Sequence, residues 1–373
     1  MDSLFAVTAP GLGLLAAQEL QKLNLSPQVE PGGVSFKADL DGLYSANLHL
    51  RTASRILARL GQFFYATTFA ELRDKASRLP WERFLKPGQP VSIRVTCQKS
   101  KLMHSDAVAE RIVGAIYDRL GKESPLKKTG DEESDSVAQL IVVRVAKDQV
   151  MVSMDSSGEL LHKRGYRLAV AKAPLRETLA AAILMAAKWD SNSPIIDPFC
   201  GSGTICIEAA QIALGIPPGI NRRFAFMEWP GYSEERWESL HSAALAPKMI
   251  DFPIYGSDRD AGAIKMAGEN AFRARVDKYT DFACHAVSAL PLPNRPGWVV
   301  TNPPYGLRVS EGKDLRNLYA QFGNVLRSQF RGWNVAILCN DPQFLGQTGL
   351  KLDTTLSLIN GGVSVRLGIG LVN

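Results

Sequence analysis

Strand-like and helix-like segments alternate along the second half of this chain, from Ala173 to the C-terminus. Short apolar runs cover residues 194–199, 253–258, 281–287, 297–302 and 334–340. Helical patterns lie between them, including Ile205–Leu214 and Ala261–Arg275. This alternation predicts a mostly parallel sheet with helices on its faces. Two late runs, Thr355–Ile359 and Val363–Val372, are expected to close the sheet as an antiparallel pair.

The tetrad Asn302-Pro303-Pro304-Tyr305 comes at the end of one of these predicted strands. The Asn302 side-chain oxygen and the Pro303 carbonyl can both accept hydrogen bonds from an exocyclic amine. The prolines stiffen the turn and supply no competing N–H, and the Tyr305 ring offers a face on which a base can stack. The tetrad therefore indicates methylation of an aromatic amine, with Asn302, Pro303 and Tyr305 as catalytic candidates. A stiff turn after a buried strand is the ordinary alternative.

A glycine loop, from Asp197 to Thr204, follows the first predicted strand. Gly201 and Gly203 let the backbone approach a ligand closely and turn into the next helix. A phosphate-binding P-loop would need a lysine, and a dinucleotide loop would need a third glycine where Cys206 stands. A loop for S-adenosylmethionine remains, in which Asp197 would accept from the methionine ammonium; a plain tight turn is the alternative. The cofactor-binding candidates are Asp197, Phe199, Gly201, Gly203 and Thr204.

A third candidate, Asp258, ends the second predicted strand. An acid at this position of a doubly wound sheet can bind ribose hydroxyls. Aspartate is also a common N-cap, but Asp260 is the better N-cap for the following helix. Asp258 is therefore added to the cofactor-binding candidates.

The order of these motifs resembles that of class I S-adenosylmethionine-dependent amino-methyltransferases. Leu160–Arg167 and Ala173–Ala181 are similar to the entry segment of the RNA guanine-N2 methyltransferases that carry a THUMP domain, and Lys101–Arg111 is similar to the THUMP core. The resemblance spans nearly the whole chain. It implies a Rossmann-like α/β methyltransferase domain, with a mostly parallel sheet, preceded by α+β ferredoxin-like and THUMP domains.

One position departs from the family pattern. Members carry an aspartate after the third strand, where it contacts the cofactor adenine, and the matching residue here is Ala286. Adenine recognition must then use backbone groups or the neighbouring His285. A buried structural histidine is the more ordinary interpretation of His285.

The resemblance implies four parts of the chain. Residues 1–60 form the ferredoxin-like domain, 61–155 the THUMP domain, 156–172 a linker and 173–373 the methyltransferase domain. A polar loop is expected at 121–136. Residues 215–250, which are rich in proline, glycine and tryptophan, interrupt the alternation and are expected to form an insertion over the active site.

The net charge of +6 favours a polyanionic partner. Arg51, Arg55 and Arg59 have the spacing of one helix stripe, which a solvated surface helix would also explain. Together with the THUMP resemblance, this pattern predicts structured RNA as the partner. The RNA-binding candidates are Arg51, Arg55, Arg59, Lys99, Lys101, Lys163, Arg164 and Arg167.

Composition limits the remaining classes of function. No apolar run reaches the 18 or so residues that span a bilayer, so no membrane is expected. The N-terminus lacks the basic start of a signal peptide, and five cysteines in an odd count suit a reducing cytoplasm. No cysteine or histidine spacing predicts a metal site. Cys200, beside the glycine loop, is expected to pack and not to react.

The resemblance implies transfer of a methyl group from S-adenosylmethionine to guanine N2 in structured RNA, with 23S rRNA as the first target and tRNA as the next. Adenine N6 in RNA or DNA stays open because it is also an exocyclic amine. An RNA-binding or assembly factor without catalysis is the third alternative. A monomer is favoured.

Overall fold

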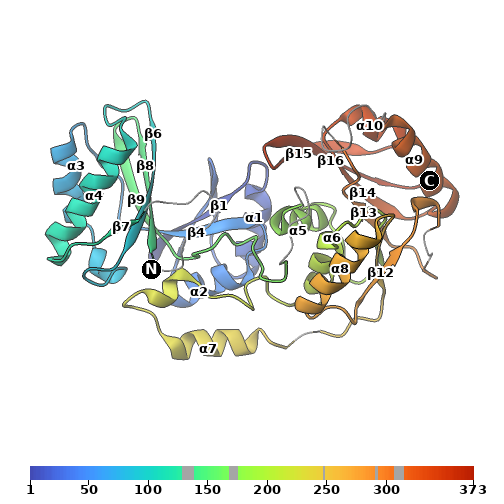
Figure 1. Ribbon diagram of the computed structural model, residues 1–373, viewed down its shortest axis with the longest axis horizontal. Helices are drawn as coiled ribbons and strands as arrows, with labels where there is room; N and C mark the ends of the chain where they lie inside the picture. Colours follow the sequence, from blue (N-terminus) through green and yellow to red (C-terminus); the bar gives the residue numbers. More distant parts are fainter. Residues whose placement is uncertain (128–137, 168–174, 247, 290–292, 306–314) are drawn as a thin grey trace.

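The computed structural model describes residues 1–127, 138–167, 175–246, 248–289, 293–305 and 315–373. The molecule is elongated, with a THUMP-like α+β unit at one end, a second small α+β unit in the middle and the α/β domain at the other end (Figure 1). In the part of the chain that is described, no helix is both long and apolar enough to cross a bilayer.

The first unit, residues 1–60, has four strands and two helices. Its elements are β1 (Asp2–Thr8), α1 (Gly13–Lys22), β2 (Gln28–Glu30), β3 (Gly33–Ala38), α2 (Leu40–His49) and β4 (Ala53–Arg59). Asp39 caps α2 by accepting from the Gly42 amide. Strand β1 pairs antiparallel with both β3 and β4.

The second unit follows without a break. It contains β5 (Phe64–Tyr65), α3 (Phe69–Ser77), β6 (Val91–Gln98), α4 (Ser105–Leu120), β7 (Leu126–Lys127), β8 (Gln139–Ala146) and β9 (Gln149–Asp155), with a 3₁₀ turn at Trp81–Arg83. Residues 128–136 of the predicted polar loop lie outside the described residues.

The two N-terminal units share one sheet. Strand β4 of the first unit pairs antiparallel with β9 of the second, with Leu57 opposite Asp155. The strand order is β2-β3-β1-β4-β9-β8-β6-β7, with β5 added on β9. Because the ladder is continuous, the two units form one platform.

The α/β domain has a seven-stranded sheet with the order β12-β11-β10-β13-β14-β16-β15. Its strands are β10 (Ile195–Asp197), β11 (Ile254–Asp258), β12 (Thr280–Cys284), β13 (Trp298–Thr301), β14 (Asn334–Cys339), β15 (Asp353–Asn360) and β16 (Val363–Leu371). Its helices are α5 (Glu177–Ala186), α6 (Thr204–Leu214), α7 (Glu234–Ala243), α8 (Ala261–Arg273), α9 (Arg316–Gln329) and α10 (Pro342–Gln347), with 3₁₀ turns at Ala225–Glu228 and Val287–Ala289. The first five strands are parallel and the last two form the predicted antiparallel closure.

Both faces of this sheet are buried, which explains its uninterrupted apolar runs. Ile195 and Val300 pack in the cluster that contains α5 and α6, whereas Ile196 and Val299 pack in the cluster that contains α9. Successive side chains of a strand point to opposite faces. Each short apolar strand therefore contributes side chains to two hydrophobic cores, one on each face of the sheet.

The prediction of a helix that carries Arg51, Arg55 and Arg59 is wrong. Helix α2 ends at His49, and Arg55 and Arg59 lie on β4 in the middle of the shared sheet. Pairing with β1 and β9 on either side overrides the helical preference of this Arg- and Ala-rich segment. The arginines therefore form no solvent-facing stripe.

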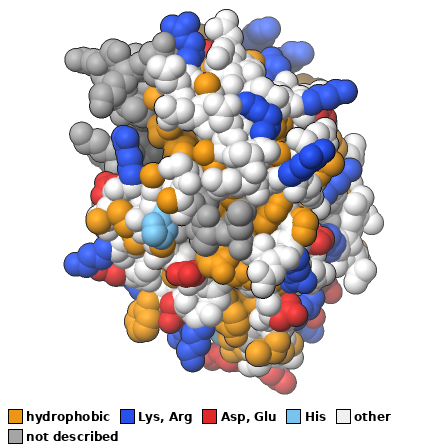
Figure 2. Space-filling view, turned by 90° about the vertical axis from the view of Figure 1, so that its right-hand side faces the viewer, with side chains coloured by type: hydrophobic (Ala, Val, Ile, Leu, Met, Phe, Trp, Pro, Cys, Tyr) orange, Lys and Arg blue, Asp and Glu red, His pale blue; other side chains and the backbone are white. Residues whose placement is uncertain are grey.

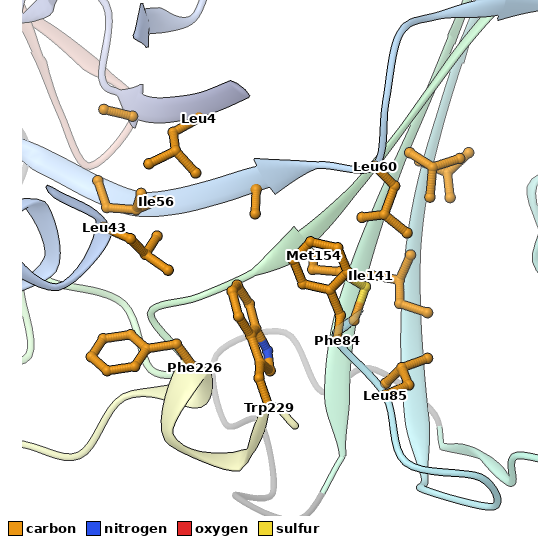
Figure 3. Packing of buried hydrophobic residues seen from close by; sticks show 14 of the residues in the cluster. Leu4, Leu43, Ile56, Leu60, Phe84, Leu85, Ile141, Met154, Phe226 and Trp229 are labelled. Carbon is orange, nitrogen blue, oxygen red and sulfur yellow. The ribbon is translucent and has the colours of Figure 1, made fainter. Parts of the chain in front are cut away.

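The insertion at 215–250 also lies elsewhere than expected. Phe226 and Trp229 belong to the core of the two N-terminal units, with Leu43, Phe84 and Met154 (Figure 3). The Trp229 indole donates to the Gln139 side chain, at 3.1 Å. Burial of these apolar rings is favourable, and the junction between the two N-terminal units provides the apolar surface against which they pack. The insertion thus straps the α/β domain to the platform and does not cover the predicted active site.

Candidate functional site

The predicted site residues meet where the strand order of the α/β sheet reverses. Strand β10 has β11 on one side and β13 on the other, and all three are parallel. Asp197, Asp258 and Thr301 end these strands. The carboxyl ends of parallel strands at such a switch point form the usual ligand crevice of doubly wound folds. The glycine loop and the Asn302 tetrad therefore leave the same edge of the sheet from neighbouring strands.

Asp197 is a buried carboxylate, with 2% of its surface exposed. Its Oδ1 accepts from the Thr301 hydroxyl at 2.6 Å and from the Phe199 amide at 3.1 Å. Burial raises the pKa of Asp197 to about 7, and the Asp258 carboxylate also raises it, against the lowering effect of the two hydrogen bonds. A cation beside Asp197 would favour its ionised form. This environment fits the ammonium of a bound amino acid.

Asn302 presents an acceptor without a partner. Its Oδ1 is buried and accepts no hydrogen bond within the described structure. A buried polar atom in this condition is costly unless a ligand supplies the missing donor. An exocyclic amine is such a donor.

Two distant side chains hold the rest of the tetrad. The Tyr319 hydroxyl on α9 lies 3.3 Å from the Pro304 carbonyl and donates to it. The Asn360 amide, at the end of β15, donates to the Tyr305 hydroxyl at 2.8 Å. These contacts fix the tetrad from opposite ends, and they join residues too far apart in the chain for any sequence spacing to indicate them.

The glycine loop has room for a ligand on one side only. A Cβ at Gly201 would meet no atom within 4 Å, whereas a Cβ at Gly203 would lie 2.9 Å from the Phe282 ring. Both glycines have positive φ, 51° and 82°. Gly201 therefore faces open space, and Gly203 allows close packing of the loop against β12.

Side chains from two other elements anchor this loop. The Gly201 amide donates to Asp258 at 3.1 Å, and Asn270 on α8 donates to the Ser202 carbonyl at 3.0 Å. Asp260 caps α8 as predicted. Asp258 is thus a support of the loop, and its contact with a ribose stays a prediction.

These residues fit S-adenosylmethionine. Asp197 offers a carboxylate that lacks a cation, Gly201 offers open backbone, and Gly203 starts α6 without a side-chain cap. Free amide groups at a helix start favour an anionic group such as a carboxylate. When bound, the cofactor supplies an electrophilic methyl group. Cys200 packs in the core as expected, and burial raises the pKa of its thiol.

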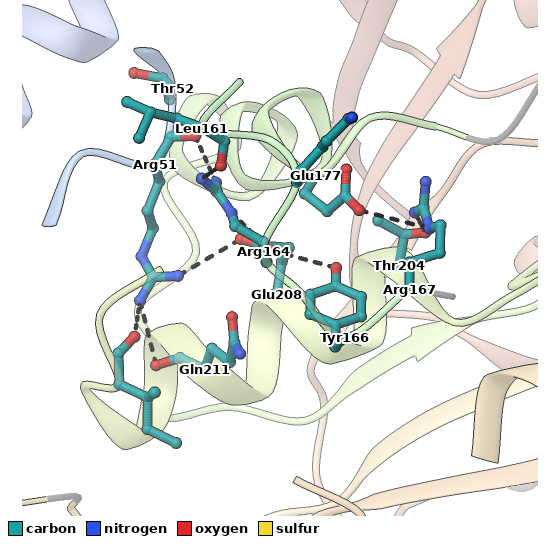
Figure 4. Close-up of polar contacts among 12 residues, drawn as sticks. Arg51, Thr52, Leu161, Arg164, Tyr166, Arg167, Glu177, Thr204, Glu208 and Gln211 are labelled. Carbon is teal, nitrogen blue, oxygen red and sulfur yellow. Dashed lines mark hydrogen bonds and ion pairs between the residues drawn. The ribbon is translucent and has the colours of Figure 1, made fainter. Parts of the chain in front are cut away.

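Three of the predicted RNA-binding arginines form a buried polar cluster instead (Figure 4). Arg51 and Arg164 both pair with Glu208 on α6, at 3.5 and 3.4 Å. The exposed fractions of the three side chains are 12%, 2% and 0%. In the same cluster, Arg167 donates to the Thr204 hydroxyl and pairs with Glu177 at 3.5 Å.

An RNA-binding role for these arginines is therefore not supported. Arg55 pairs with the fully buried Asp155, and Arg59 pairs with Glu30 at 2.9 Å. Each acid comes from an element distant in sequence, so the spacing of the arginines could not reveal it. The cluster instead connects the platform, the linker and the helix that follows the glycine loop.

The predicted lysines are on the surface. Lys99 and Lys101 are exposed on the THUMP unit, and Lys163 lies 3.6 Å from Glu159. Lys and Arg side chains on the methyltransferase end of the molecule are spread over the visible face and form no single continuous patch there (Figure 2). Charge on that face does not by itself mark an RNA path.

His285 and Ala286 are both exposed. The interpretation of His285 as a buried structural histidine is wrong, because β12 is the edge strand and ends at Cys284. Thr301, Tyr319 and Asn360 were not predicted as residues of the site. Only Thr301 had a sequence signal, since it directly precedes Asn302.

Comparison with known proteins assigns the three domains of the chain. Residues 164–366 match the RMKL-like methyltransferase domain, residues 3–57 the RlmL ferredoxin-like domain and residues 66–155 the THUMP domain. The Synechocystis protein slr0064, named for an inferred RNA methyltransferase activity, is 33% identical over 97% of this chain and 95% of its own length. The chain belongs to this methyltransferase family.

Solved structures agree with the family. SMU.472, described as a methyltransferase by inference and solved in complex with SAH, is 33% identical, with a TM-score of 0.87 over 100% of this chain and 98% of its own. A Listeria monocytogenes protein, named from its sequence as an N6-adenine-specific DNA methylase, is 34% identical, with a TM-score of 0.83 over 98% of this chain and 95% of its own.

The family fixes the general chemistry. This member is a methyltransferase that uses S-adenosylmethionine, and its RlmL-type ferredoxin-like and THUMP domains make RNA its class of substrate. The described residues contain no group of three or more histidine, cysteine, aspartate or glutamate side chains that could hold a metal ion.

Proposed function

We propose that the protein transfers a methyl group from S-adenosylmethionine to N2 of a guanine in structured RNA, with 23S rRNA as the first target and tRNA as the next. The observation that carries the proposal is the buried, unpartnered Oδ1 of Asn302, which directly follows β13, the strand next to the one that ends at Asp197. An amine donor and a methyl donor would be held at neighbouring strand ends.

The chain's own residues suffice to position the amine. The target nucleotide would be flipped out of its stack, because an in-stack amine is shielded. Tyr305 would stack on the base, while the Asn302 side chain and the Pro303 carbonyl would accept from the amine. Alignment accounts for most of the acceleration. No strong general base is required, because the amine becomes acidic as it is methylated.

Adenine N6 is the second candidate. Both target atoms are exocyclic amines on flat rings, so the tetrad accommodates either, and the name of the Listeria relative favours adenine. The platform formed by the RlmL ferredoxin-like and THUMP domains favours RNA over DNA. An inactive assembly factor would have no need for the unpartnered Asn302 acceptor, and the exposed Ala286 is the position that keeps this third alternative open.

A methyl-transfer assay separates the three candidates. The full chain is incubated with tritiated S-adenosylmethionine and either bulk RNA from cells lacking the protein or DNA. Nucleoside chromatography after nuclease digestion then names the atom, and N2-methylguanosine is the expected product. N6-methyladenine would replace the proposal with the second candidate, and no transfer to either polymer would support the third. Cytoplasmic location and a monomeric state stay predictions.

A further inference from the structure

Asn360, which holds the hydroxyl of Tyr305, lies at the tip of the β15–β16 hairpin. It is the last residue of β15, the edge strand of its sheet, and it donates to the Tyr305 hydroxyl at 2.8 Å. Gly361 and Gly362 follow it, and both have positive φ. Because a turn of two glycines has few steric limits on its conformation, the position of Asn360 depends on what packs against β15.

The first unit packs against β15 through its backbone. A Cβ placed at Gly11 would lie 2.5 Å from the Ser357 carbonyl oxygen and 3.0 Å from Leu358 Cδ2. Backbones that approach this closely leave no space for a side chain between them, so only glycine fits at position 11. Figure 1 shows the hairpin reaching from the methyltransferase end of the molecule towards α1.

The turn that carries Gly11 has a defined shape. The Leu12 amide donates to the Ala9 carbonyl at 3.1 Å, which closes a four-residue turn with Pro10 and Gly11 in the middle. Gly11 has a φ of 89°. Proline followed by a glycine of positive φ is typical of a type II β-turn. Since proline also fixes its own φ, the turn presents a well-defined surface to β15.

Buried leucines extend this contact to the side of Tyr305. Leu12 and Leu358 are each 1% exposed and belong to the same core cluster, against which the half-buried Tyr305 also packs. Leu358 and Asn360 are two residues apart on β15, so their side chains lie on the same face of the strand. The face of β15 that packs on the first unit therefore also carries the donor that holds Tyr305.

We propose that the Pro10–Gly11 turn of the first unit positions Tyr305 for stacking on the target base. The turn fixes the position of β15, β15 fixes that of Asn360, and Asn360 holds the ring by its hydroxyl. The inference rests on the proposed function, in which Tyr305 stacks on the base. It adds a positioning role for a unit that lies outside the methyltransferase domain.

A methyl group at position 11 would disturb these contacts at their start. The Ser357 oxygen belongs to the backbone and cannot rotate aside, so either β15 or the turn has to move. A displacement of about 1 Å takes the 2.8 Å hydrogen bond between Asn360 and Tyr305 beyond bonding length. The Tyr305 hydroxyl would then lose this donor.

The variant Gly11→Ala has a matched control in the same unit. Gly32 has a φ of 88°, close to the 89° of Gly11, but a Cβ at Gly32 would meet no atom within 4 Å. Gly32→Ala therefore introduces similar backbone strain without the contact. A difference between the two variants measures the effect of the contact with β15.

Fluorine NMR of the free protein reports on Tyr305 without any methyl transfer. The nine tyrosines are replaced by 3-fluorotyrosine, and Tyr305→Phe identifies the signal of this ring. Gly11→Ala should shift or broaden the Tyr305 signal, as Asn360→Ala does. Gly32→Ala should leave the signal at the wild-type position.

A second variant of the same turn adds no atom to the contact. Pro10 is exposed, and Pro10→Ala removes the fixed φ of the turn, so it should broaden the Tyr305 signal. It also serves as the test if Gly11→Ala does not fold. A Tyr305 signal that stays at the wild-type position and width in the folded variants of this turn would overturn the proposal.

Steady-state kinetics on RNA gives a separate measurement. Gly11→Ala should raise KM for RNA severalfold and leave the cofactor Kd unchanged, because the glycine loop follows β10, several strands from the hairpin. The losses from Gly11→Ala and Asn360→Ala should be less than additive, because both act through one hydrogen bond. Fully additive losses would overturn the proposal. Absence of methyl transfer in the wild type would instead contradict the proposed function and leave the NMR result standing.

Discussion

Thr301, at the end of β13, donates a hydrogen bond of 2.6 Å to Asp197, at the end of β10. One residue precedes the Asn302 tetrad and the other opens the glycine loop. The contact therefore joins the strand that leads to the proposed amine site with the strand that leads to the proposed cofactor site. It also stabilises the ionised form of a carboxylate that burial disfavours.

Replacing Thr301 with valine should weaken S-adenosylmethionine binding about tenfold, because a hydrogen bond to a charged group is lost while the volume is conserved. The pKa of Asp197 should rise further. Calorimetry of cofactor binding across pH measures both effects. Thr301→Ser keeps the hydroxyl and should behave like the wild type, and a valine variant with unchanged affinity would show that the contact is only structural.

Cofactor affinity should depend on pH through Asp197. With a pKa of about 7 before binding, the carboxyl is mostly protonated in acid and cannot pair with the ammonium. Affinity should therefore improve about tenfold from pH 5.5 to 7. Asp197→Asn should bind weakly with little dependence on pH over this range. A wild-type Kd that stays flat over this range would contradict the assignment.

Asn302→Ala should lower kcat on the order of 100-fold, as for loss of a positioned polar group at a reacting centre. The cofactor Kd should be unchanged, because Asn302 lies on the amine side of the site. Asn340→Ala is the matched control, since Asn340 follows β14 as Asn302 follows β13. Loss of cofactor binding with normal turnover of the bound enzyme would refute the role.

Asn360 should act through Tyr305, whose hydroxyl it holds at 2.8 Å. Asn360→Ala and Tyr305→Phe each remove this contact, and each should raise KM for RNA severalfold by loosening the ring. The double variant should be no worse than either single variant, because both changes break one interaction. Steady-state kinetics on RNA gives the comparison, and additive losses would mean that the two residues act independently.

Arg51 should matter for stability and not for RNA affinity. Its side chain pairs with the fully buried Glu208, which keeps Arg164 as a second partner when Arg51 is removed. Arg51→Ala also leaves the Gln211 and Ile216 carbonyls without this donor, which costs about 1–3 kcal/mol. The Tm should fall by about 2 °C or more in calorimetry. The salt slope of RNA binding should not change. A slope lowered by about 0.9 with a normal Tm would restore the RNA-contact interpretation.

Local sequence patterns predicted the elements of the α/β domain and the chemistry at their ends. Strand–helix alternation gave β10 to β14 within a few residues, and the tetrad and glycine loop both lie at strand ends as their composition requires. Local patterns suffice here because turns, caps and buried strands depend on neighbouring residues. The resemblance to the family added the order of the domains.

The interaction partners of the buried side chains became known from the folded arrangement alone. In the sequence, Arg51 and Arg55 have the pattern of surface cations. In the structure, they pair with the buried carboxylates of Glu208 and Asp155. The insertion containing Trp229 packs on the platform because the apolar junction lies there. Pairing between residues distant in the sequence depends on which surfaces come together on folding. The spacing of residues along the chain does not predict it.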